Sequence, residues 1–530
     1  MIVASYWPQL PLLRIALAAV QLAFILPPSS QTMDLLPLRA AAGGGTIDGL
    51  EAARLVAAGF TLLQRSAPLV RALAGKRAAI LLPSSPQFLT ALAAGDGRGV
   101  VLVNPLAAPA EIDYQLADAQ VGAVFTTAAM QGRLPSHLPR VLLDDAPTSA
   151  IFTSPGGDAQ RIDLGNHFGL DLEGDADAPG RDEECAIVYT SAMAGTPLGA
   201  VLTHRNLLAN ARQTVEAAAN TSADHVLAVL PFSHLFGLTV SLIAPLLAGA
   251  RVTTMARFNP IAAVDLIDRE GITEIVGVPA VFAAMLQAIA RRGGARGGAL
   301  PGSKLRLCIC GGAPLSVELQ EQWEAITGVP LRQGYGLTEA GPVALFNRVS
   351  APNVLGTLGL PFPDVRVSIR DPETNTECTP EEEGEICVAG ETVFRGYIGA
   401  SEVAAPGSLR PVSREARANS AGLRTVDGWL HTGDRGRVRA DGRVEFVGLY
   451  KPMFTRNAFN IYPAELERVL RAMPGVRAVR AFAIPEPARE NDIGLDITAS
   501  ATVSEADVKA WCEPRLAQYK QPSRITLRHD

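Results

Sequence analysis

Small and hydroxyl side chains gather in the run Tyr189-Thr-Ser-Ala-Met-Ala-Gly-Thr-Pro-Leu-Gly199. An apolar strand is expected over 186–189, before this loop, and a helix is expected from Thr203. Such loops can bring backbone N–H groups and hydroxyls against phosphate oxygens. The Gly-Lys-Ser/Thr ending of a P-loop is absent, and small-residue loops are more often plain turns. Alone, the run permits phosphate binding without requiring it.

Two further segments place flexible backbone or an imidazole where a ligand could reach them. Gly311-Gly-Ala-Pro314 follows a strand expected over 305–310, and α/β sheets bind ligands at the carboxyl ends of their strands. Pro231-Phe-Ser-His-Leu-Phe-Gly237 carries His234. A histidine considered alone is more often structural than functional, so each segment is a weak signal by itself.

Two glycine-bounded turns offer groups that suit a nucleotide. Gly334-Tyr-Gly-Leu-Thr-Glu-Ala-Gly341 contains an aromatic ring for stacking, a hydroxyl, and a carboxylate suited to Mg²⁺. Gly428-Trp-Leu-His-Thr-Gly-Asp434 places a carboxylate in a tight turn, where it can hold ribose hydroxyls. Each turn, seen singly, is more often a plain turn than a site.

The elements expected around these segments form a large α/β layer. Apolar residues recur at near-helical spacing over 46–66. A strand, a helix and a strand over 77–83, 87–94 and 99–104 predict a βαβ unit and a parallel sheet. Further strands are expected at 121–125, 225–230, 251–255, 274–278 and 305–310.

The pattern changes after about residue 355. Short, turn-separated strands predict a small β-rich subdomain, and residues 452–530 predict a compact α+β tail. The short strands are expected at 365–370, 384–389 and 443–447. Polar, turn-rich stretches at 154–183 and 400–426 predict surface loops.

Taken together, the five segments resemble the superfamily of acyl-adenylate-forming enzymes. This superfamily contains acyl- and aryl-CoA synthetases, firefly-type luciferases and peptide-synthetase adenylation domains. The resemblance covers roughly residues 45–525 and includes linkers such as Gly356-Thr-Leu-Gly-Leu-Pro361. It implies an α/β fold: a large N-terminal α/β domain with a β-rich subdomain, and a small α+β C-terminal domain joined by a hinge. We place the two domains at 33–450 and 451–530, after an apolar extension, 1–32, of open status.

The resemblance also implies roles for single residues. Thr190, Ser191 and Gly195 are expected in the phosphate loop. Gly311 and Gly312 are expected to lie along the adenine, and Tyr335 is expected to stack on it. Thr338 is expected to contact the α-phosphate, Glu339 to bind Mg²⁺ and Asp434 to bind the ribose. His234 is expected between the acyl pocket and the adenylate, and Lys451 on the hinge. His234, Thr338 and Glu339 are the implied catalytic residues.

The implied reaction uses ATP, Mg²⁺ and, for the second step, coenzyme A. A carboxylate attacks the α-phosphorus of ATP to give acyl-AMP and pyrophosphate, and a thiol then displaces AMP. The pocket sequence carries no lone charge that would suit an amino acid. The expected partner is therefore an apolar fatty or aryl acid.

The chain departs from the family pattern mainly at its cations. The family's phosphate loop reads Ser-Gly-Thr-Thr-Gly-x-Pro-Lys-Gly, whereas this loop has Ala192, Met193, Ala194 and, at the lysine, Leu198. Near the hinge, Leu449 replaces an arginine, Thr455 a lysine and Ala458 a glycine, and the family's later Gly-Lys pair has no counterpart before Asp530. Losing one preorganised charge contact typically costs ~3–4 kcal/mol of transition-state stabilisation. Weak or altered adenylation is therefore expected.

Composition narrows the class of protein. Hydrophobic residues make up 48% and charged residues 19%, which is typical of a globular chain, and the net charge of −6 does not favour nucleic acid. The six cysteines lack metal-ligand spacing, and Cys308 and Cys310 are expected to be buried thiols, which indicates a reducing, cytoplasmic location. The apolar stretch 12–26 is shorter than the ~20 residues of a membrane span, and Arg14 lies inside it. An amphipathic or buried helix, or a true start at Met33, remains open.

Three functions remain open at this point. The first is an acid–thiol ligase of weak or altered activity. The second is a non-catalytic protein that keeps the acyl or AMP pocket for sensing or scaffolding. The third is a half-enzyme that uses acyl-adenylate made elsewhere.

Overall fold

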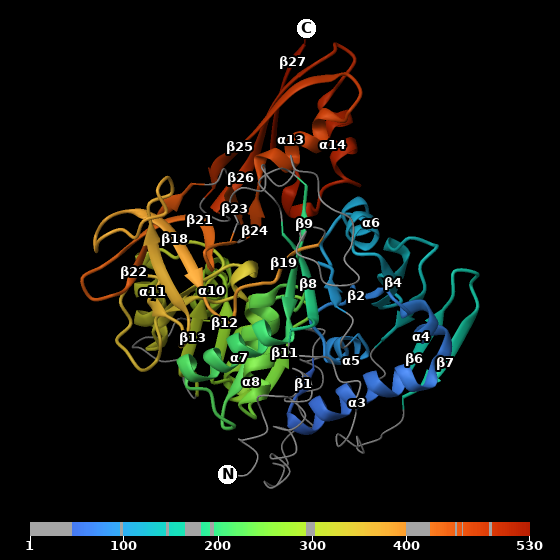
Figure 1. Ribbon diagram of the computed structural model, residues 1–530, viewed down its shortest axis with the longest axis horizontal. Coiled ribbons are helices and arrows are strands. Elements are labelled where there is room, and N and C mark those ends of the chain that lie inside the picture. Colours follow the sequence, from blue (N-terminus) through green and yellow to red (C-terminus); the bar gives the residue numbers. More distant parts are fainter. Residues whose placement is uncertain are drawn as a thin grey trace.

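The computed structural model describes most of the 530-residue chain. The described residues are 45–95, 99–144, 148–164, 182–190, 196–292, 303–398, 425–450, 453–457, 459–486 and 490–529. Their elements form two large sheets covered by helices, a smaller antiparallel sheet, and a separate α+β unit at the C-terminal end (Figure 1). The predicted α/β class is confirmed. The extension 1–32 lies outside the described residues.

The first large sheet contains the predicted βαβ unit. Its strand order is β19-β9-β8-β3-β2-β4-β5-β6-β7, parallel in its middle and antiparallel at both ends. The strands are β2 (Arg77–Ile80), β3 (Val100–Leu102), β4 (Val121–Thr126), β5 (Arg140–Leu142), β6 (Ser149–Thr153), β7 (Ala159–Asp163), β8 (Glu184–Thr190), β9 (Leu198–Thr203) and β19 (Gly396–Tyr397). The helices are α3 (Gly49–Arg65), α4 (Ala67–Leu73), α5 (Gln87–Ala94) and α6 (Pro109–Asp118).

The second large sheet has the order β1-β11-β10-β12-β13-β14-β15-β16, with parallel pairing from β11 to β14. The strands are β1 (Thr46–Ile47), β10 (His225–Ala228), β11 (Arg251–Thr254), β12 (Glu274–Gly277), β13 (Leu307–Cys310), β14 (Leu331–Tyr335), β15 (Leu345–Phe346) and β16 (Leu360–Pro361). The helices are α7 (His204–Ala218), the π-helix η4 (Phe236–Ile243), α8 (Ala244–Leu247), α9 (Pro260–Glu270), α10 (Pro279–Arg291), α11 (Val317–Thr327) and the short 3₁₀ turn η5 (Thr338–Ala340). Because the central strands are parallel, their carboxyl ends meet at one edge of the sheet.

The remaining elements form the predicted β-rich subdomain and the α+β tail. The subdomain contains β17 (Arg366–Arg370), β18 (Gly384–Ala389), β20 (Thr425–Val426), β21 (Trp429–Val438) and β22 (Val444–Leu449). The tail contains the hairpin β23 (Phe454–Arg456) and β24 (Phe459–Ile461), then α13 (Pro463–Arg471), β25 (Val476–Glu486), β26 (Glu490–Ala499), α14 (Glu505–Cys512), η6 (Gln518–Lys520) and β27 (Arg524–His529). The tail packs around an apolar cluster of its own, which includes Leu466, Leu495 and Val508.

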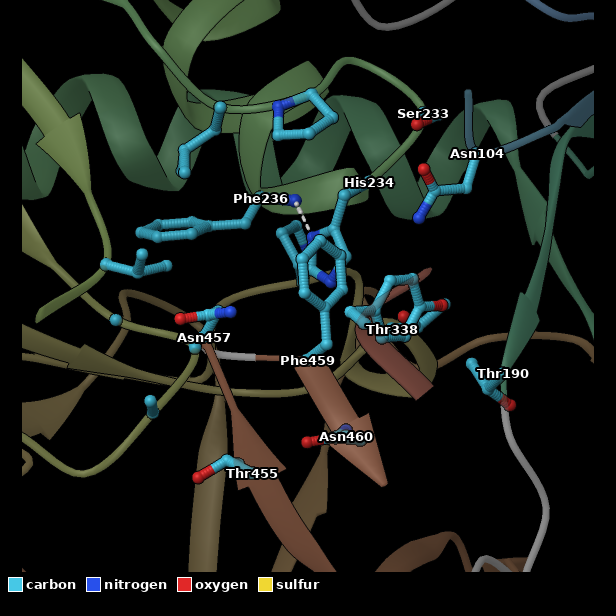
Figure 2. A pocket seen from close by; sticks show the side chains of 18 of the residues that line it. Asn104, Thr190, Ser233, His234, Phe236, Thr338, Thr455, Asn457, Phe459 and Asn460 are labelled. Carbon is cyan, nitrogen blue, oxygen red and sulfur yellow. Dashed lines mark hydrogen bonds between the residues drawn. The ribbon is translucent and has the colours of Figure 1, made fainter. Parts of the chain in front are cut away.

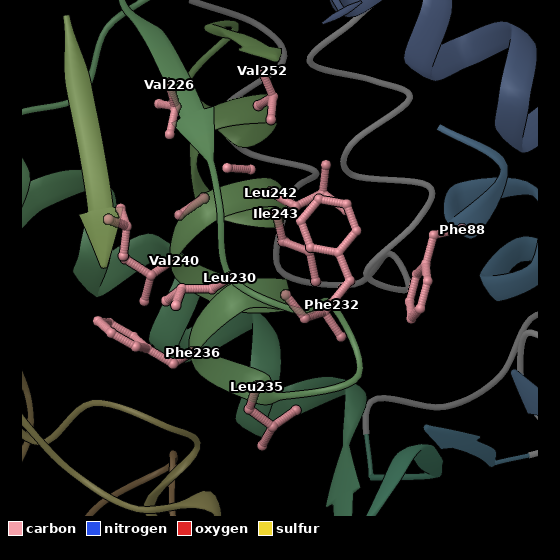
Figure 3. Packing of buried hydrophobic residues seen from close by; sticks show 14 of the residues in the cluster. Phe88, Val226, Leu230, Phe232, Leu235, Phe236, Val240, Leu242, Ile243 and Val252 are labelled. Carbon is pink, nitrogen blue, oxygen red and sulfur yellow. The ribbon is translucent and has the colours of Figure 1, made fainter. Parts of the chain in front are cut away.

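One apolar core joins the two large sheets. Phe88 of α5, which covers the first sheet, meets Phe232, in the loop after β10 of the second sheet, edge-to-face, with ring centroids 5.6 Å apart (Figure 3). Both rings are fully buried, and burying such a side chain contributes about 1.5–3 kcal/mol. The two sheets are therefore held as one body, and their facing edges can share a site.

Local sequence signals explain where the helices begin. Asp48 accepts a hydrogen bond from Glu51 N at 2.8 Å and starts α3. Thr203 and Asn206 form a reciprocal capping box that starts α7 right after β9. The helix expected from Thr203 is therefore confirmed.

Three expectations about the elements were wrong. The helix expected over 46–66 begins only at Gly49, because Thr46–Ile47 pair with β11. A strand, β9, lies between the small-residue loop and α7, where no strand was expected. The surface loop expected over 154–183 contains β7, whose mostly exposed side chains lack the apolar alternation that marks a strand. Most of the loop expected over 400–426 lies outside the described residues.

Candidate active site

All described residues predicted for the site line one cavity of about 1470 Å³. It lies where the two large sheets, the β-rich subdomain and the tail meet. The residues are Thr190, His234, Gly311, Gly312, Tyr335, Thr338, Glu339 and Asp434. Ser191, Gly195 and Lys451 lie outside the described residues.

The glycine pair after β13 lets other chain segments approach its carboxyl end. A Cβ at Gly311 would lie 3.0 Å from Gly334 O and 3.2 Å from Phe236 Cζ, closer than most real contacts. Gly312 has φ +79°, a conformation that side chains rarely adopt. A flat ligand can therefore lie against bare backbone here.

Tyr335 and Asp434 come from different sheets and are joined by a hydrogen bond. The Tyr335 hydroxyl donates to Asp434 Oδ2 at 2.7 Å. Asp434 N donates to Thr432 Oγ1 at 3.1 Å, and Gly433 before it has φ +72°. Both residues lie within β21, where Asp434 pairs with Leu449 of β22, so the expectation that Asp434 lies in a tight turn was wrong. Burial and the neighbouring Asp434 carboxylate raise the pKa of Tyr335 well above its usual value, so its hydroxyl remains a donor.

Glu339 is buried and held by two hydroxyls from the first sheet. Its Oε1 accepts hydrogen bonds from Thr190 Oγ1 at 3.0 Å and from Tyr397 OH at 2.7 Å. No hydrogen bond within the described residues engages its other oxygen, Oε2, and this carboxylate lines the cavity. A carboxylate oriented in this way suits a hard cation such as Mg²⁺.

His234 lies two residues before the π-helix η4 and faces the cavity (Figure 2). Phe236 N donates to His234 Nδ1 at 3.2 Å, so the neutral ring carries its hydrogen on Nε2. The side chain is accessible from the cavity but lies deep among protein atoms, and this desolvation lowers its pKa. His234 is therefore a neutral donor at neutral pH.

Apolar side chains form the wall next to His234. They include Leu230, Phe236, Met255, Val278, Val281 and Val343. Asn104 and Ser233 add polar groups at one side, and Phe459 of β24 points into the cavity from the tail (Figure 2). This wall can bury an uncharged, apolar group.

Cations are scarce around the cavity. Among the described lining residues, the carboxylates are Glu111, Glu339 and Asp434, and the cations are Arg257 and Lys520. Lys520 Nζ is already paired with Glu111 Oε1 at 2.7 Å. A bound triphosphate would therefore meet little positive charge from these residues.

The altered phosphate loop is described at its two ends. Leu198, which replaces the family's lysine, pairs across β8–β9 with Thr190. Arg205, near the start of α7, does not line the cavity. Its guanidinium is paired with Asp182 at 2.6 Å and with Glu391 at 3.4 Å. Arg205 therefore does not supply the missing charge in this arrangement.

Sequence reasoning missed several residues that line the cavity or support a lining residue from behind. Tyr397, which holds Glu339, follows a glycine on a two-residue strand and carries no pattern of its own. Phe459 and the hairpin β23–β24 were treated only as part of the tail. Lys520 could have been singled out from the sequence, because it is one of only five lysines in the chain.

Comparison with known proteins agrees with this geometry. The sequence model of the family described as AMP-binding enzyme matches residues 69–398. The chain is 33% identical to a feruloyl-CoA synthase of Amycolatopsis, over 85% of this chain and 84% of the relative. It is 29% identical to 4-coumarate–CoA ligase 1 of rice, Oryza sativa (83% and 77% covered), and 28% identical to a long-chain-fatty-acid–CoA ligase of Bacillus subtilis (86% and 82% covered).

Solved structures show the same fold. An o-succinylbenzoate CoA synthetase of Bacillus subtilis aligns with a TM-score of 0.73 at 23% identity, covering 98% of this chain and 95% of that one. ATP-bound MatB of Rhodopseudomonas palustris aligns with a TM-score of 0.60 at 26% identity, covering 91% and 89%. No helix of the described residues is long and apolar enough to cross a membrane. The family match over more than half of the sequence establishes that the chain belongs to the AMP-binding, acyl-adenylate-forming enzymes and is a relative of acid–CoA ligases.

Proposed function

We propose that this chain converts an apolar carboxylic acid to its acyl-AMP and passes the acyl group to coenzyme A. The observation that carries the proposal is the meeting of Gly311, Tyr335, Thr338, Glu339 and Asp434 around one cavity. In the first step a carboxylate oxygen bonds to the α-phosphorus of ATP and pyrophosphate leaves. In the second step the thiol sulfur bonds to the acyl carbonyl carbon and AMP leaves.

The cavity residues divide these tasks. Tyr335 stacks on the adenine, while Asp434 accepts hydrogen bonds from the ribose hydroxyls. Thr338 contacts the α-phosphate, where its hydroxyl can donate to the oxygens that gain charge. Glu339 would hold Mg²⁺, which would neutralise phosphate charge. His234 donates from Nε2 at the junction between the apolar wall and the adenylate.

The acid proposed is an aryl or fatty acid. The wall beside His234 is apolar, and burying apolar surface there favours such an acid by roughly 25 cal/mol per Å². Relatives of this chain carry names that specify ferulate, coumarate and long-chain fatty acids. We also propose that the small domain begins at 451, with Lys451 on the hinge between the two domains.

The first step is proposed to be slow. The attacking carboxylate and the triphosphate are both anionic, so the transition state needs nearby cations. Leu198 stands where the family has a lysine, and the described lining offers Arg257 as its one cation without an ion pair to a carboxylate. Adenylation is therefore expected to be weaker than in a typical ligase.

The same shortage of cations favours a second candidate, a half-enzyme that takes acyl-AMP made elsewhere. Acyl-AMP carries one phosphate charge, so the missing lysine matters less to it than to ATP. A non-catalytic acyl-AMP sensor would share this preference, and it differs by forming no thioester.

ATP–pyrophosphate exchange across a panel of aryl and fatty acids tests the proposal. Exchange with one class of acid, followed by thioester formation with coenzyme A, supports the ligase. Thioester formation from supplied acyl-AMP without any exchange supports the half-enzyme. Thermal stabilisation by acyl-AMP with neither reaction supports the sensor.

A further inference from the structure

Lys520 lies buried between the large domain and the tail and is bonded to both. Its Nζ donates to Glu111 Oε1 at 2.7 Å and to Glu465 Oε1 at 2.7 Å. Glu111 belongs to α6 of the large domain, whereas Glu465 belongs to α13 of the tail. The contact with Glu111 joins residues 409 positions apart in the sequence. One lysine therefore connects two separately packed parts of the chain.

The three charges depend on each other. The exposed fractions of the Lys520, Glu111 and Glu465 side chains are 5%, 10% and 3%. Burial alone would lower the pKa of Lys520, but the carboxylates of Glu465 and Glu111 raise it above its usual value. Removing the lysine would leave two carboxylates facing each other with little water, which is strongly unfavourable. The ammonium therefore favours keeping Glu111 and Glu465 together.

The neighbouring residues connect this ion pair to the cavity. Tyr519, next to Lys520, stacks on Phe459 with centroids 4.1 Å apart and ring planes at 15°. Arg456 of β23 donates from Nη1 to Tyr519 O at 3.2 Å and to Gln521 O at 2.7 Å. Phe459 points into the cavity across from the wall that carries His234 (Figure 2). The segment that carries Lys520 thus supports the hairpin that closes the cavity.

The tail presents this hairpin, and not its last strand, to the cavity. β23 and β24 lie at the junction with the large domain, while β27 runs toward the far end of the molecule (Figure 1). A second contact across the same junction joins Ala110 N to Pro514 O at 3.2 Å. The arrangement therefore places the β23–β24 residues against the site where acyl-AMP would sit.

We infer that Lys520 is a positioning residue, which clamps the tail onto Glu111 in the arrangement used for thioester formation. The inference rests on the two-step function proposed above. It adds that the Lys520–Glu111 ion pair sets the rate of the second step, thioester formation. When the ion pair forms, Phe459 is held over the acyl-AMP site. When the tail moves away, Lys520 must leave Glu111 but keeps Glu465, which travels with it.

Because Glu111 belongs to the large domain and Glu465 to the tail, substituting them one at a time separates the contact across the junction from the contact inside the tail. Glu111→Gln weakens the contact that crosses the domain junction and keeps an oxygen that can still accept from Ala108 N at the start of α6, whereas Glu465→Gln alters a contact inside the tail. Lys520→Met removes both contacts, and Lys520→Arg restores the charge. Lys509→Met is the matched control, because it breaks an exposed lysine–glutamate pair in the same part of the chain.

The first measurement is single-turnover thioester formation from supplied acyl-AMP and coenzyme A. Glu111→Gln is expected to lower the rate constant by about tenfold or more, and Lys520→Met by at least as much. Lys520→Arg is expected to recover part of the rate, Glu465→Gln to act less than Glu111→Gln, and Lys509→Met to match the wild type. A loss of folding, detected by near-UV circular dichroism, would identify a merely structural effect of Lys520→Met.

The second measurement is the distance between spin labels on the exposed positions Asp113 and Ala478, each replaced by cysteine. Cys378, the one cysteine that is not buried, is replaced by serine. Glu111→Gln is expected to broaden or shift the distance distribution, and Lys509→Met is expected to leave it unchanged. This readout needs no turnover, so it tests the clamp even when the chain forms no thioester and the proposed function fails. If the wild type ligates acids while Glu111→Gln changes neither the rate nor the distances, the inference is overturned.

Discussion

Replacing Asp434 by alanine removes the carboxylate that accepts the Tyr335 hydroxyl at 2.7 Å and lines the cavity. If this carboxylate also accepts from ribose hydroxyls, the variant loses charge-assisted hydrogen bonds to AMP. One such bond contributes about 1.5–3 kcal/mol, so the Kd for AMP should rise about 10- to 150-fold. The change also removes the carboxylate to which the Tyr335 hydroxyl donates, which acts in the same direction.

Two further variants separate the ribose contact from general damage. Tyr335→Phe keeps the Asp434 carboxylate and the stacking ring, so its effect on AMP binding should be smaller than that of Asp434→Ala. Asp441→Ala removes an exposed carboxylate of the same subdomain, which is paired with Arg443, and should leave AMP binding unchanged.

Isothermal titration calorimetry with AMP and with a non-hydrolysable acyl-AMP analogue measures these constants. The acyl-AMP analogue should lose the same factor as AMP, because both carry the same ribose. Unchanged AMP affinity in Asp434→Ala would refute the assignment of Asp434 to the ribose. Failure of the wild type to bind either ligand would refute the nucleotide site itself.

Three other outcomes are expected. The double variant Ala192→Gly and Leu198→Lys should raise ATP–pyrophosphate exchange above the wild type, because it restores a cation beside the phosphates; an exchange rate that stays flat while acyl-AMP still binds would place the defect elsewhere. Glu274 is buried, and burial raises its pKa from 4.5 to about 7. Between these two pH values the folded protein keeps a proton on Glu274 that the unfolded chain loses. The free energy of unfolding therefore falls as pH rises from about 4.5 to 7. Glu274→Gln should therefore stabilise the protein at pH 8 by at most about 3 kcal/mol and give no gain near pH 4, as measured by urea unfolding at both pH values; equal gains at both would contradict the pKa argument. Deleting residues 1–32 should leave a folded protein with an unchanged melting temperature, because the family-like pattern begins only near residue 46; a shortened chain that fails to fold would show that the apolar segment packs into the core.

Several central strands of the two large sheets were predictable because they are buried on both faces, although the parallel strands β5 and β14 of the same sheets were not predicted. Runs such as β4, β10 and β12 are nearly continuous apolar sequences, and each was placed to within a few residues. Elements at the edges of the sheets were harder to predict. β7 is a polar edge strand and β9 follows a small-residue loop, so neither shows the alternation on which prediction depends.

The sequence by itself determined the family and predicted residues that the fold brings together around one cavity. Tyr335, Thr338 and Glu339 lie within one short segment, and Gly311–Gly312 follow a strand directly, so local order specifies what they offer a ligand. It also showed the loss of the phosphate-loop lysine, since Leu198 occupies a fixed place in a motif.

Only the tertiary structure decided which distant groups support these residues. The bonds from Thr190 and Tyr397 to Glu339, and from Lys520 to Glu111, join positions separated by tens to hundreds of residues. No periodicity or short motif encodes such pairs, because they form only when separate sheets and domains pack together. The physical reason is that a hydrogen bond or ion pair acts over about 3 Å in space, while sequence patterns report only neighbours along the chain.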